Sequence, residues 1–215
     1  MSRRPLLALP FVLLFTLLLA GCFTGERPTF DSTDTFQPGT PTGDANVDPI
    51  LDQLDHVTKG PATAHYEVLT KYGNLQTNAS VELSPGKRNV IVDNTRYIQS
   101  DKGTATCTVD RTIACSSGFD PTRISDVGIT VDFYGSDAAK RLRRDTQAKI
   151  GPTVPHTATI AGQKVKCVDI PLNGGTAVYC VLSNGLLAKR DDGDIRILMK
   201  SYSATVDSTV FDIPT

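Results

Sequence analysis

Most of the chain alternates apolar and polar residues with a period of two, which is typical of strands with one buried and one wet face. The clearest case is the segment 75–83, where Leu, Thr, Ala, Val and Leu alternate with Gln, Asn, Ser and Glu. Similar patterns predict further strands at 66–72, 90–92, 95–99, 157–161, 164–170, 177–182, 186–189 and 195–202. Turn sequences such as Asn184-Gly185 and Asp192-Gly193 separate them, and such pairs are strong hairpin signals. The pattern predicts an antiparallel meander of eight to eleven strands.

Helical patterns interrupt this meander at a few places. Residues 49–58 carry an apolar stripe behind Asp48, a good N-cap residue. A second helix is predicted at 137–150 with Ser136 as its cap, and a short one at 121–127. Helices gathered on one face of an antiparallel sheet give an α+β domain, and a long twisted meander curls. The predicted fold is therefore a curved antiparallel sheet, a half-open barrel, with two or three helices packed on its concave side.

The N-terminus has the features of an export signal. Arg3 and Arg4 precede an apolar run that is too short for a membrane-spanning helix. The run ends in Leu19-Ala20-Gly21-Cys22, which resembles a bacterial lipobox. The resemblance implies cleavage after residue 21 and lipid attachment to Cys22. A plain signal peptide followed by an incidental cysteine is the alternative.

Three regions follow from this pattern. Residues 1–21 are predicted to be a lipoprotein signal peptide. Residues 22–46 are rich in Thr, Pro, Gly and Asp and lack an apolar period, which predicts a disordered tether. Residues 47–215 are long enough for a single α+β domain with its own core. The expected location is the extracytoplasmic face of the cell membrane, with the lipid on Cys22 as the anchor, since two or more acyl chains hold a protein there stably.

Charge and composition narrow the range of partners. The formal net charge of the chain is −1, and loss of residues 1–21 would remove two basic residues and no acidic one. A domain of this charge is not expected to bind nucleic acid. The chain has no Trp, so its core must consist mainly of Val, Ile, Leu and Ala. We expect a monomer and no cofactor, while a protein partner cannot be named from sequence.

The four cysteines after Cys22 are expected to form disulfides. Four cysteines allow three pairings. Cys107–Cys115 and Cys167–Cys180 are the favoured pairs, because each joins neighbouring strands of one hairpin. Since Cys167 and Cys180 share their faces with apolar residues, the second disulfide is expected on the inner face of the sheet. Metal binding is the rival interpretation, but the spacings match no usual zinc pattern and no His lies near in sequence, so no metal site is predicted.

The sequence offers no catalytic motif. His56, His65 and His156 are isolated from one another, and neither a metalloprotease pattern nor a nucleophile elbow is present. A catalytic triad assembled from distant residues remains the alternative. The prediction is that the protein is not an enzyme and has no catalytic residues.

The densest run of charge lies in the second predicted helix, from Lys140 to Arg144. Helical spacing places Lys140 and Arg144 on one side, where they would contact anionic lipid headgroups. The favoured interpretation is a solvated helix face, in which Arg141 pairs with Asp137 and Asp145 at helical spacing.

The order of elements and the end of the chain resemble a known superfamily. The chain closes on a strand followed by Asp207, Phe211 and Pro214, and Asn184-Gly185-Leu186-Leu187 is followed by Asp191-Asp192-Gly193. These features resemble the LolA/LolB-like superfamily, including lipoproteins of the LppX/LprG kind. The resemblance implies a half-open antiparallel barrel with helices at its mouth and a cavity for the acyl chains of lipids or lipoproteins. Two disulfides and an aromatic-poor interior depart from that pattern.

Two functions remain open from sequence. The first is a membrane-anchored envelope lipoprotein that binds or carries an apolar ligand, a lipid by preference. Its cavity would be lined by inward-facing residues of the sheet, for which the candidates are Tyr66, Val68, Val81, Leu83, Val90 and Ile197. The same side chains would equally serve as packed core. The second function is a non-enzymatic protein-interaction or sensor lipoprotein with a fully packed core. An apolar cavity of roughly several hundred Å³ would favour the first.

Overall fold

The computed structural model describes residues 36–57, 60–110, 112–120 and 129–214 of the 215-residue chain. The chain divides into two units, residues 1–34 and 35–215, and only the second unit contains described residues. The sheet and helices of the structure all belong to that second unit.

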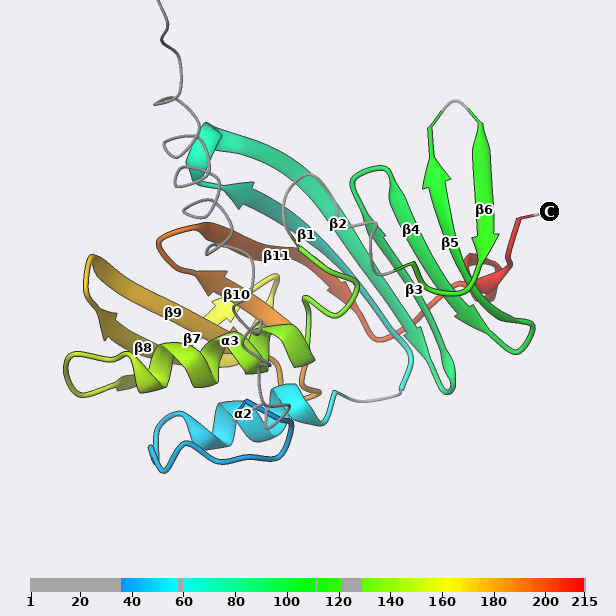
Figure 1. The fold of residues 1–215 in the computed structure, drawn as a ribbon. Helices are drawn as coiled ribbons and strands as arrows, with labels where there is room; N and C mark the ends of the chain where they lie inside the picture. Colours follow the sequence, from blue (N-terminus) through cyan, green and yellow to red (C-terminus); the bar gives the residue numbers. More distant parts are fainter. Residues whose placement is uncertain (1–35, 58–59, 111, 121–128, 215) are drawn as a thin grey trace, which may run out of the picture. The chain divides into compact units, whose positions relative to one another are not determined.

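A single antiparallel sheet forms most of the fold, and Figure 1 shows it as a curved, open surface. Its strands are β1 (Ala62–Thr70), β2 (Leu75–Ser84), β3 (Lys87–Val92), β4 (Thr95–Ser100), β5 (Gly103–Val109), β6 (Ile113–Ser117), β7 (Val154–Ile160), β8 (Gln163–Leu172), β9 (Gly175–Val181), β10 (Leu187–Asp191) and β11 (Ile195–Ser203). The spatial order is β6-β5-β4-β3-β2-β1-β11-β10-β9-β8-β7, so two meanders meet where the first strand pairs with the last. The antiparallel meander predicted from the alternating pattern is confirmed, with eleven strands. Because β6 and β7 form opposite edges, the barrel stays half open.

Two α-helices occur in the described part of the chain, α2 (Asp48–Asp55) and α3 (Ser136–Gln147). Two short 3-10 helices, η2 (Tyr72–Asn74) and η3 (Ser208–Phe211), complete the elements. Both predicted long helices exist but end earlier than predicted. The short helix predicted at 121–127 lies outside the described residues.

Asp48 does not cap α2 as predicted. It lies inside the helix, and Val47 is the N-cap residue. Its carboxylate accepts hydrogen bonds from the backbone N–H of Thr42 (2.8 Å) and of Gly43 (3.1 Å) in the preceding loop. Asp48 therefore fastens the loop to the helix. Its carboxylate accepts backbone N–H groups in this role as it would in a cap, so the local sequence does not distinguish the two.

Both α-helices lie against the same face of the sheet, which we call the helix-covered face. On it, the hydroxyl of Tyr179 in β9 donates a 2.6 Å hydrogen bond to Asp145 of α3. Nearer the middle of the sheet, the ring of Tyr66 in β1 meets Phe133 edge-on, with 5.1 Å between the ring centroids. Apolar residues of the helices complete this core, namely Ile50, Leu51, Leu54, Ala138, Ala139 and Leu142.

The opposite face of the sheet has a smaller core beneath the C-terminal segment. Ile98 of β4 and Ala105 of β5 are buried there with Ile213 packed against them. The guanidinium of Arg96 donates a 2.7 Å hydrogen bond to the carbonyl of Val210, which holds the segment in place. Asp207 begins η3 by accepting a hydrogen bond from the N–H of Thr209.

The folded part begins before residue 47, where the predicted tether was expected to end. Residues 36–46 form a strap against α2, α3 and the start of β7. The N–H of Gly39 donates to the carboxylate of Asp55 (2.8 Å), and the hydroxyl of Thr153 donates to Asp44 (2.9 Å). Lys149 forms an ion pair with Asp44 as well. Residues 36–46 thus have the composition of a linker but make polar contacts with the folded domain. A tether stays a prediction for residues 22–35.

Candidate functional site

The six residues proposed to line a ligand cavity all lie on the helix-covered face and are buried. The register places Val68 opposite Ile197 and Val81 opposite Val90, so these side chains share one side of the sheet. Each of the six is at most 6% exposed. They pack into the main core, and Leu83 also lines a smaller pocket. In the described part of the chain, these residues are packed core and do not surround an open cavity.

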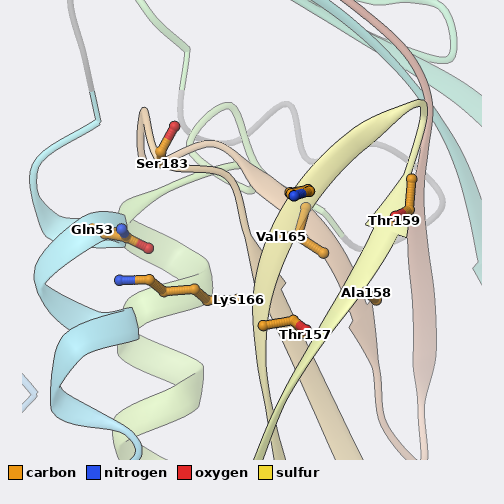
Figure 2. A pocket seen from close by; sticks show the side chains of 8 residues that line it. Gln53, Thr157, Ala158, Thr159, Val165, Lys166 and Ser183 are labelled. Carbon is orange, nitrogen blue, oxygen red and sulfur yellow. The ribbon is translucent and has the colours of Figure 1, made fainter.

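A large pocket lies at one margin of the helix-covered face, and we call it the margin groove. Its volume is about 670 Å³. It is bounded by α2, the β7–β8 hairpin and the link between β9 and β10, as Figure 2 shows. The lining residues are Gln53, Thr157, Ala158, Thr159, Lys164, Val165, Lys166 and Ser183. The groove is therefore distinct from the predicted cavity over the middle of the sheet.

The groove exists because β8 extends beyond the cover of the helices. Val168 and Ile170 are buried on the helix-covered face, and Lys166 and Lys164 continue the same alternation outward. Across the hairpin, Thr157 pairs with Lys166 and Thr159 pairs with Lys164. The helix-covered face thus changes from apolar to polar at the point where α2 ends its contact with the strand.

The groove carries positive charge without a compensating carboxylate. Both lysines are exposed, and no described Asp or Glu lies within ion-pair distance of either. The side chain of Lys166 extends toward α2 and Gln53 (Figure 2). The Oε1 atom of Gln53 is buried and has no hydrogen-bond partner among the described residues. Cations that line a concave site raise the local concentration of anions.

A glycine in the β9–β10 link holds α2 beside the groove. Gly185 has φ of +88°, and a Cβ there would lie 2.3 Å from the carbonyl oxygen of Gln53 and 2.9 Å from Cα of Val57. The Asn184-Gly185 pair, whose sequence predicts a hairpin turn, therefore also permits close approach between sheet and helix. Only a residue without a side chain fits this contact.

The charge run of α3 contains a buried ion pair that sequence reasoning missed. Arg143 and Asp55 each have side chains 3% exposed, and the guanidinium donates to both carboxylate oxygens. The Nε–H of Arg143 also donates to the carbonyl of Thr40 in the strap (2.8 Å). This pair joins α2, α3 and the strap. No local signal separates Arg143 from its exposed neighbours, because its partner lies 88 positions away.

The other residues of the run are partly as predicted. Arg141 pairs with Asp145 at 3.1 Å, which confirms that i, i+4 pair. Arg144 is exposed, and its guanidinium lies over the ring of Phe36, 5.7 Å from the centroid. Contact of Lys140 and Arg144 with lipid headgroups stays a prediction.

Asp145 also joins a polar network beneath α3. Burial raises the pKa of the Tyr179 hydroxyl well above its ordinary value, and this hydroxyl donates a hydrogen bond to the carboxylate of Asp145. Burial by itself would raise the pKa of Asp192, but Arg190 and two backbone N–H groups outweigh it and lower that pKa. The groups in this network satisfy one another, which indicates a structural role.

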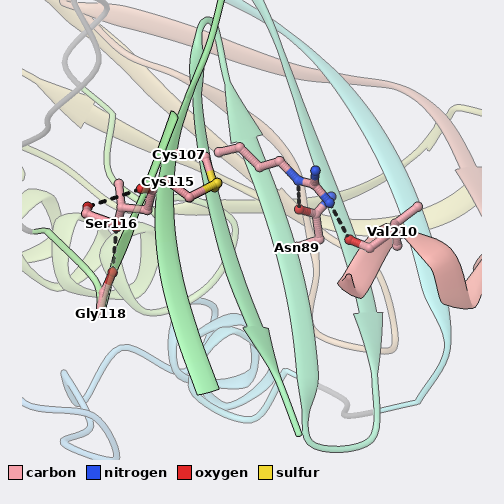
Figure 3. Close-up of a disulfide and its surroundings, with 8 residues drawn as sticks. Asn89, Cys107, Cys115, Ser116, Gly118 and Val210 are labelled. Atoms are coloured by element: carbon pink, nitrogen blue, oxygen red, sulfur yellow. Dashed lines mark hydrogen bonds between the residues drawn. A yellow bond between two sulfur atoms is a disulfide. The ribbon is translucent and has the colours of Figure 1, made fainter. Parts of the chain in front are cut away.

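A second polar cluster lies on the opposite face, under the C-terminal segment. Asn89 donates to the carboxylate of Glu82 (2.8 Å). It also accepts a hydrogen bond from Nε of Arg96 (2.7 Å), which is drawn in Figure 3. Burial raises the pKa of Glu82 despite these contacts. Glu82 is thus a buried carboxyl whose ionisation opposes folding.

Both predicted disulfides are present, Cys107–Cys115 (Figure 3) and Cys167–Cys180. The second does not lie on the inner face. Cys180 follows Tyr179, whose side chain reaches α3, and successive residues of a strand point to opposite faces. The disulfide therefore faces away from the helices. Apolar neighbours gave the wrong side because this part of the sheet is buried on both faces.

Comparisons with known proteins give distant likenesses of fold. No protein-family model matches the chain, and no curated protein matches it. The solved structure of MucB is similar over 80% of this chain and 64% of that one, with 12% identity and a TM-score of 0.47. In the MucA/MucB complex of Pseudomonas aeruginosa, the match covers 79% of this chain and 62% of that one, with 8% identity and a TM-score of 0.45. The chain therefore spans less than two thirds of the MucB chains.

A lipoprotein-sorting domain is a further distant neighbour. The putative outer membrane lipoprotein-sorting protein domain from Vibrio parahaemolyticus matches over 76% of this chain and 95% of its own, with 9% identity and a TM-score of 0.31. Likenesses of this size identify no family. Within the described ranges, no helix is both long and apolar enough to cross a membrane.

Proposed function

We propose that this protein is a lipid-anchored lipoprotein of the cell envelope that binds an anionic, amphipathic ligand, a lipid by preference, in the margin groove. Binding would be non-covalent, and no enzymatic step is proposed. The observation that carries the proposal is the groove itself, a concavity of about 670 Å³ with two unpaired lysines and no acidic lining residue. Ligand sites commonly have volumes of about 300–1,000 Å³.

The lining suits a ligand with a charged end and an apolar part. The methylene stems of Lys164 and Lys166 provide apolar contact, while the ammonium groups remain available to an anion. Burial of a hydrocarbon chain contributes about 0.8 kcal/mol per methylene. An ion pair at an exposed lysine adds about 0.2–1 kcal/mol. Chain burial would therefore supply most of the affinity, and the lysines would supply selectivity for the anion.

The membrane anchor belongs to the same proposal. The lipobox-like sequence ending at Cys22 would attach acyl chains and place the domain on the extracytoplasmic face of the cell membrane. Amphiphiles of the envelope would then be the molecules available to the groove. A search for such ligands should accordingly begin with lipids.

A packed protein-interaction domain is the second candidate function. It is favoured by the burial of all six residues that were expected to line an acyl cavity. In this case the groove would contact part of a partner protein.

A titration with matched probes tests the first function. The full chain would be titrated with a fluorescent twelve-carbon fatty acid and with the corresponding uncharged alcohol. Lys164→Gln/Lys166→Gln should weaken binding of the acid by roughly 2- to 30-fold, as expected for two exposed ion pairs. The same variant should leave binding of the alcohol nearly unchanged.

Lys102→Gln/Lys200→Gln is the matched control, because both lysines are exposed and neither lines the groove. Equal effects of the two double variants on the acid would reject the groove as the anion site. If neither the acid nor the alcohol binds the unaltered protein, the ligand-binding function is rejected and the interaction domain remains.

A further inference from the structure

Three donor residues lie side by side at the outer end of the β7–β8–β9 sheet. The register pairs His156 of β7 with Cys167 of β8, and Cys167 with Cys180 of β9. Cross-strand partners share a face, so the imidazole lies on the same side as the disulfide. Their ligand atoms all lie within 4.8 Å of one another. The hairpin thus brings together in space a histidine and two cysteines that are separated in sequence.

A carboxylate stands beside this row. Asp169 is two residues after Cys167 on the same face, and its Oδ1 atom lies 3.6 Å from Nδ1 of His156. That oxygen is buried and lacks a hydrogen-bond partner among the described residues. Buried polar atoms are usually satisfied, so an unsatisfied carboxylate oxygen next to donor groups points to a ligand role.

We propose that reduction of the Cys167–Cys180 disulfide turns this row into a binding site for Zn²⁺. The ligands would be the two thiolates and His156, with Asp169 either as the fourth ligand or as the group that orients the imidazole. Thiolate and imidazole ligands suit Zn²⁺. With metal–ligand distances of about 2.0–2.3 Å, tetrahedral ligands lie about 3.3–3.8 Å apart, so donors already within 4.8 Å need only small movements.

The chemistry balances with a dithiol as reductant. The S–S bond of the protein breaks, each of its sulfurs takes one proton, and the dithiol is oxidised to its own disulfide. Zn²⁺ then displaces both thiol protons as it binds. Reoxidation of the cysteines would release the ion, so metal binding and the disulfide exclude each other.

The other disulfide serves as an internal comparison. Cys107 and Cys115 also have Cα atoms 4.0 Å apart on neighbouring antiparallel strands. The residue beside Cys107 on the next strand is Arg96, a cation that cannot ligate a metal. Because reduced Cys107 and Cys115 would lack a third donor, we expect them to bind Zn²⁺ only weakly.

Both sulfurs are nearly inaccessible, since Cys167 is 1% and Cys180 is 2% exposed. The side chain of His156 is 39% exposed and lies on the edge strand β7. An ion would reach the row past His156 and Asp169, whose side chain is 35% exposed, and the two buried cysteines would form the inner wall of the site.

Cobalt(II) is the probe for the test, because thiolate-bound tetrahedral Co²⁺ has visible and near-ultraviolet absorption bands. The full chain would be reduced with a phosphine in detergent, with Cys22→Ser in every variant so that this cysteine does not contribute. We expect one Co²⁺ per chain with a thiolate charge-transfer band, displaced by Zn²⁺. Cys107→Ala/Cys115→Ala should retain this spectrum.

Three further variants locate the ligands. Cys167→Ser should abolish the band, and His156→Asn should weaken Co²⁺ binding at least 10-fold. Asp169→Asn should weaken it about 10- to 100-fold if the carboxylate orients the imidazole. Lack of a band in the reduced protein, or a band that survives in Cys167→Ser, would overturn the proposal.

A folding control separates a preformed row from binding by an unfolded chain. The far-ultraviolet circular dichroism of Cys167→Ser/Cys180→Ser reports whether the sheet survives without the disulfide. Retention of the sheet together with cobalt binding by the reduced protein supports the site. Unfolding of this variant or of the reduced protein would overturn the proposal, since the row would then not exist.

Discussion

Replacement of Arg143 by Met should be among the most damaging single changes in the helices. The side chains of Arg143 and Asp55 are each 3% exposed, so the substitution leaves a buried carboxylate without its counter-ion. Breaking a buried pair from one side costs about 3–5 kcal/mol. Since the urea dependence of stability for such a domain is roughly 2 kcal/mol per M, the midpoint should fall by roughly 1.5–2.5 M.

The assay is equilibrium unfolding in urea followed by circular dichroism. Arg144→Met is the matched control, because it makes the same substitution one residue later at an exposed position, and it should cost less than about 1 kcal/mol. The double variant Asp55→Leu/Arg143→Met should lose less stability than Arg143→Met alone, because no buried charge remains unpaired. The single variant Asp55→Leu completes the comparison. A double variant whose loss of stability equals the sum of the losses in Asp55→Leu and Arg143→Met would refute this reasoning.

Three further predictions concern the turn, the buried carboxyl and the disulfide. Gly185→Ala should lower the free energy of unfolding by about 3 kcal/mol, because the new side chain meets a positive φ and clashes with α2. Gly193→Ala is the control, since open space surrounds Gly193, and it should change the free energy by less than about 0.5 kcal/mol. Similar melting temperatures for the two variants would contradict the contact between Gly185 and α2. Because burial raises the pKa of Glu82, its contribution to stability is complete below roughly pH 4.3 and is lost as the pH rises through the raised value. Glu82→Gln should therefore be more stable than the unaltered protein at pH 7 but not at pH 3.5 in urea titrations, and a parallel pH dependence of the two would be inconsistent with a buried carboxyl. Cys167→Ala/Cys180→Ala should cost about 3 kcal/mol in thermal unfolding through the lost chain constraint, and a cost below about 1 kcal/mol would argue against a stabilising role.

The strands could be predicted from sequence because their cause is local. A period of two and Asn-Gly or Asp-Gly turns define hairpins within short windows, and both meanders consist of such hairpins. The pairing of β1 with β11 joins residues more than a hundred positions apart, and no local pattern encodes it. That pairing places the two halves in one sheet, so the order of strands was not predictable in the same way.

The site was harder to predict than the fold. Alternation correctly grouped Tyr66, Val68 and Ile197 on one face, but it does not show whether a buried face is packed or hollow. The groove arises instead where α2 stops covering β8, a matter of helix length and docking. The burial of Arg143 likewise depends on a distant partner, so its neighbours in the charge run gave no warning.

Native mass spectrometry of the full chain, purified from a bacterial envelope, tests most directly whether the margin groove binds an anionic amphiphile. The account predicts a co-purifying anionic lipid on the unaltered protein and on Lys102→Gln/Lys200→Gln, with most of it lost from Lys164→Gln/Lys166→Gln. A ligand-free mass for the unaltered protein, even after addition of anionic lipid, would contradict the account. Equal retention of the lipid by all three proteins would contradict the location of the site.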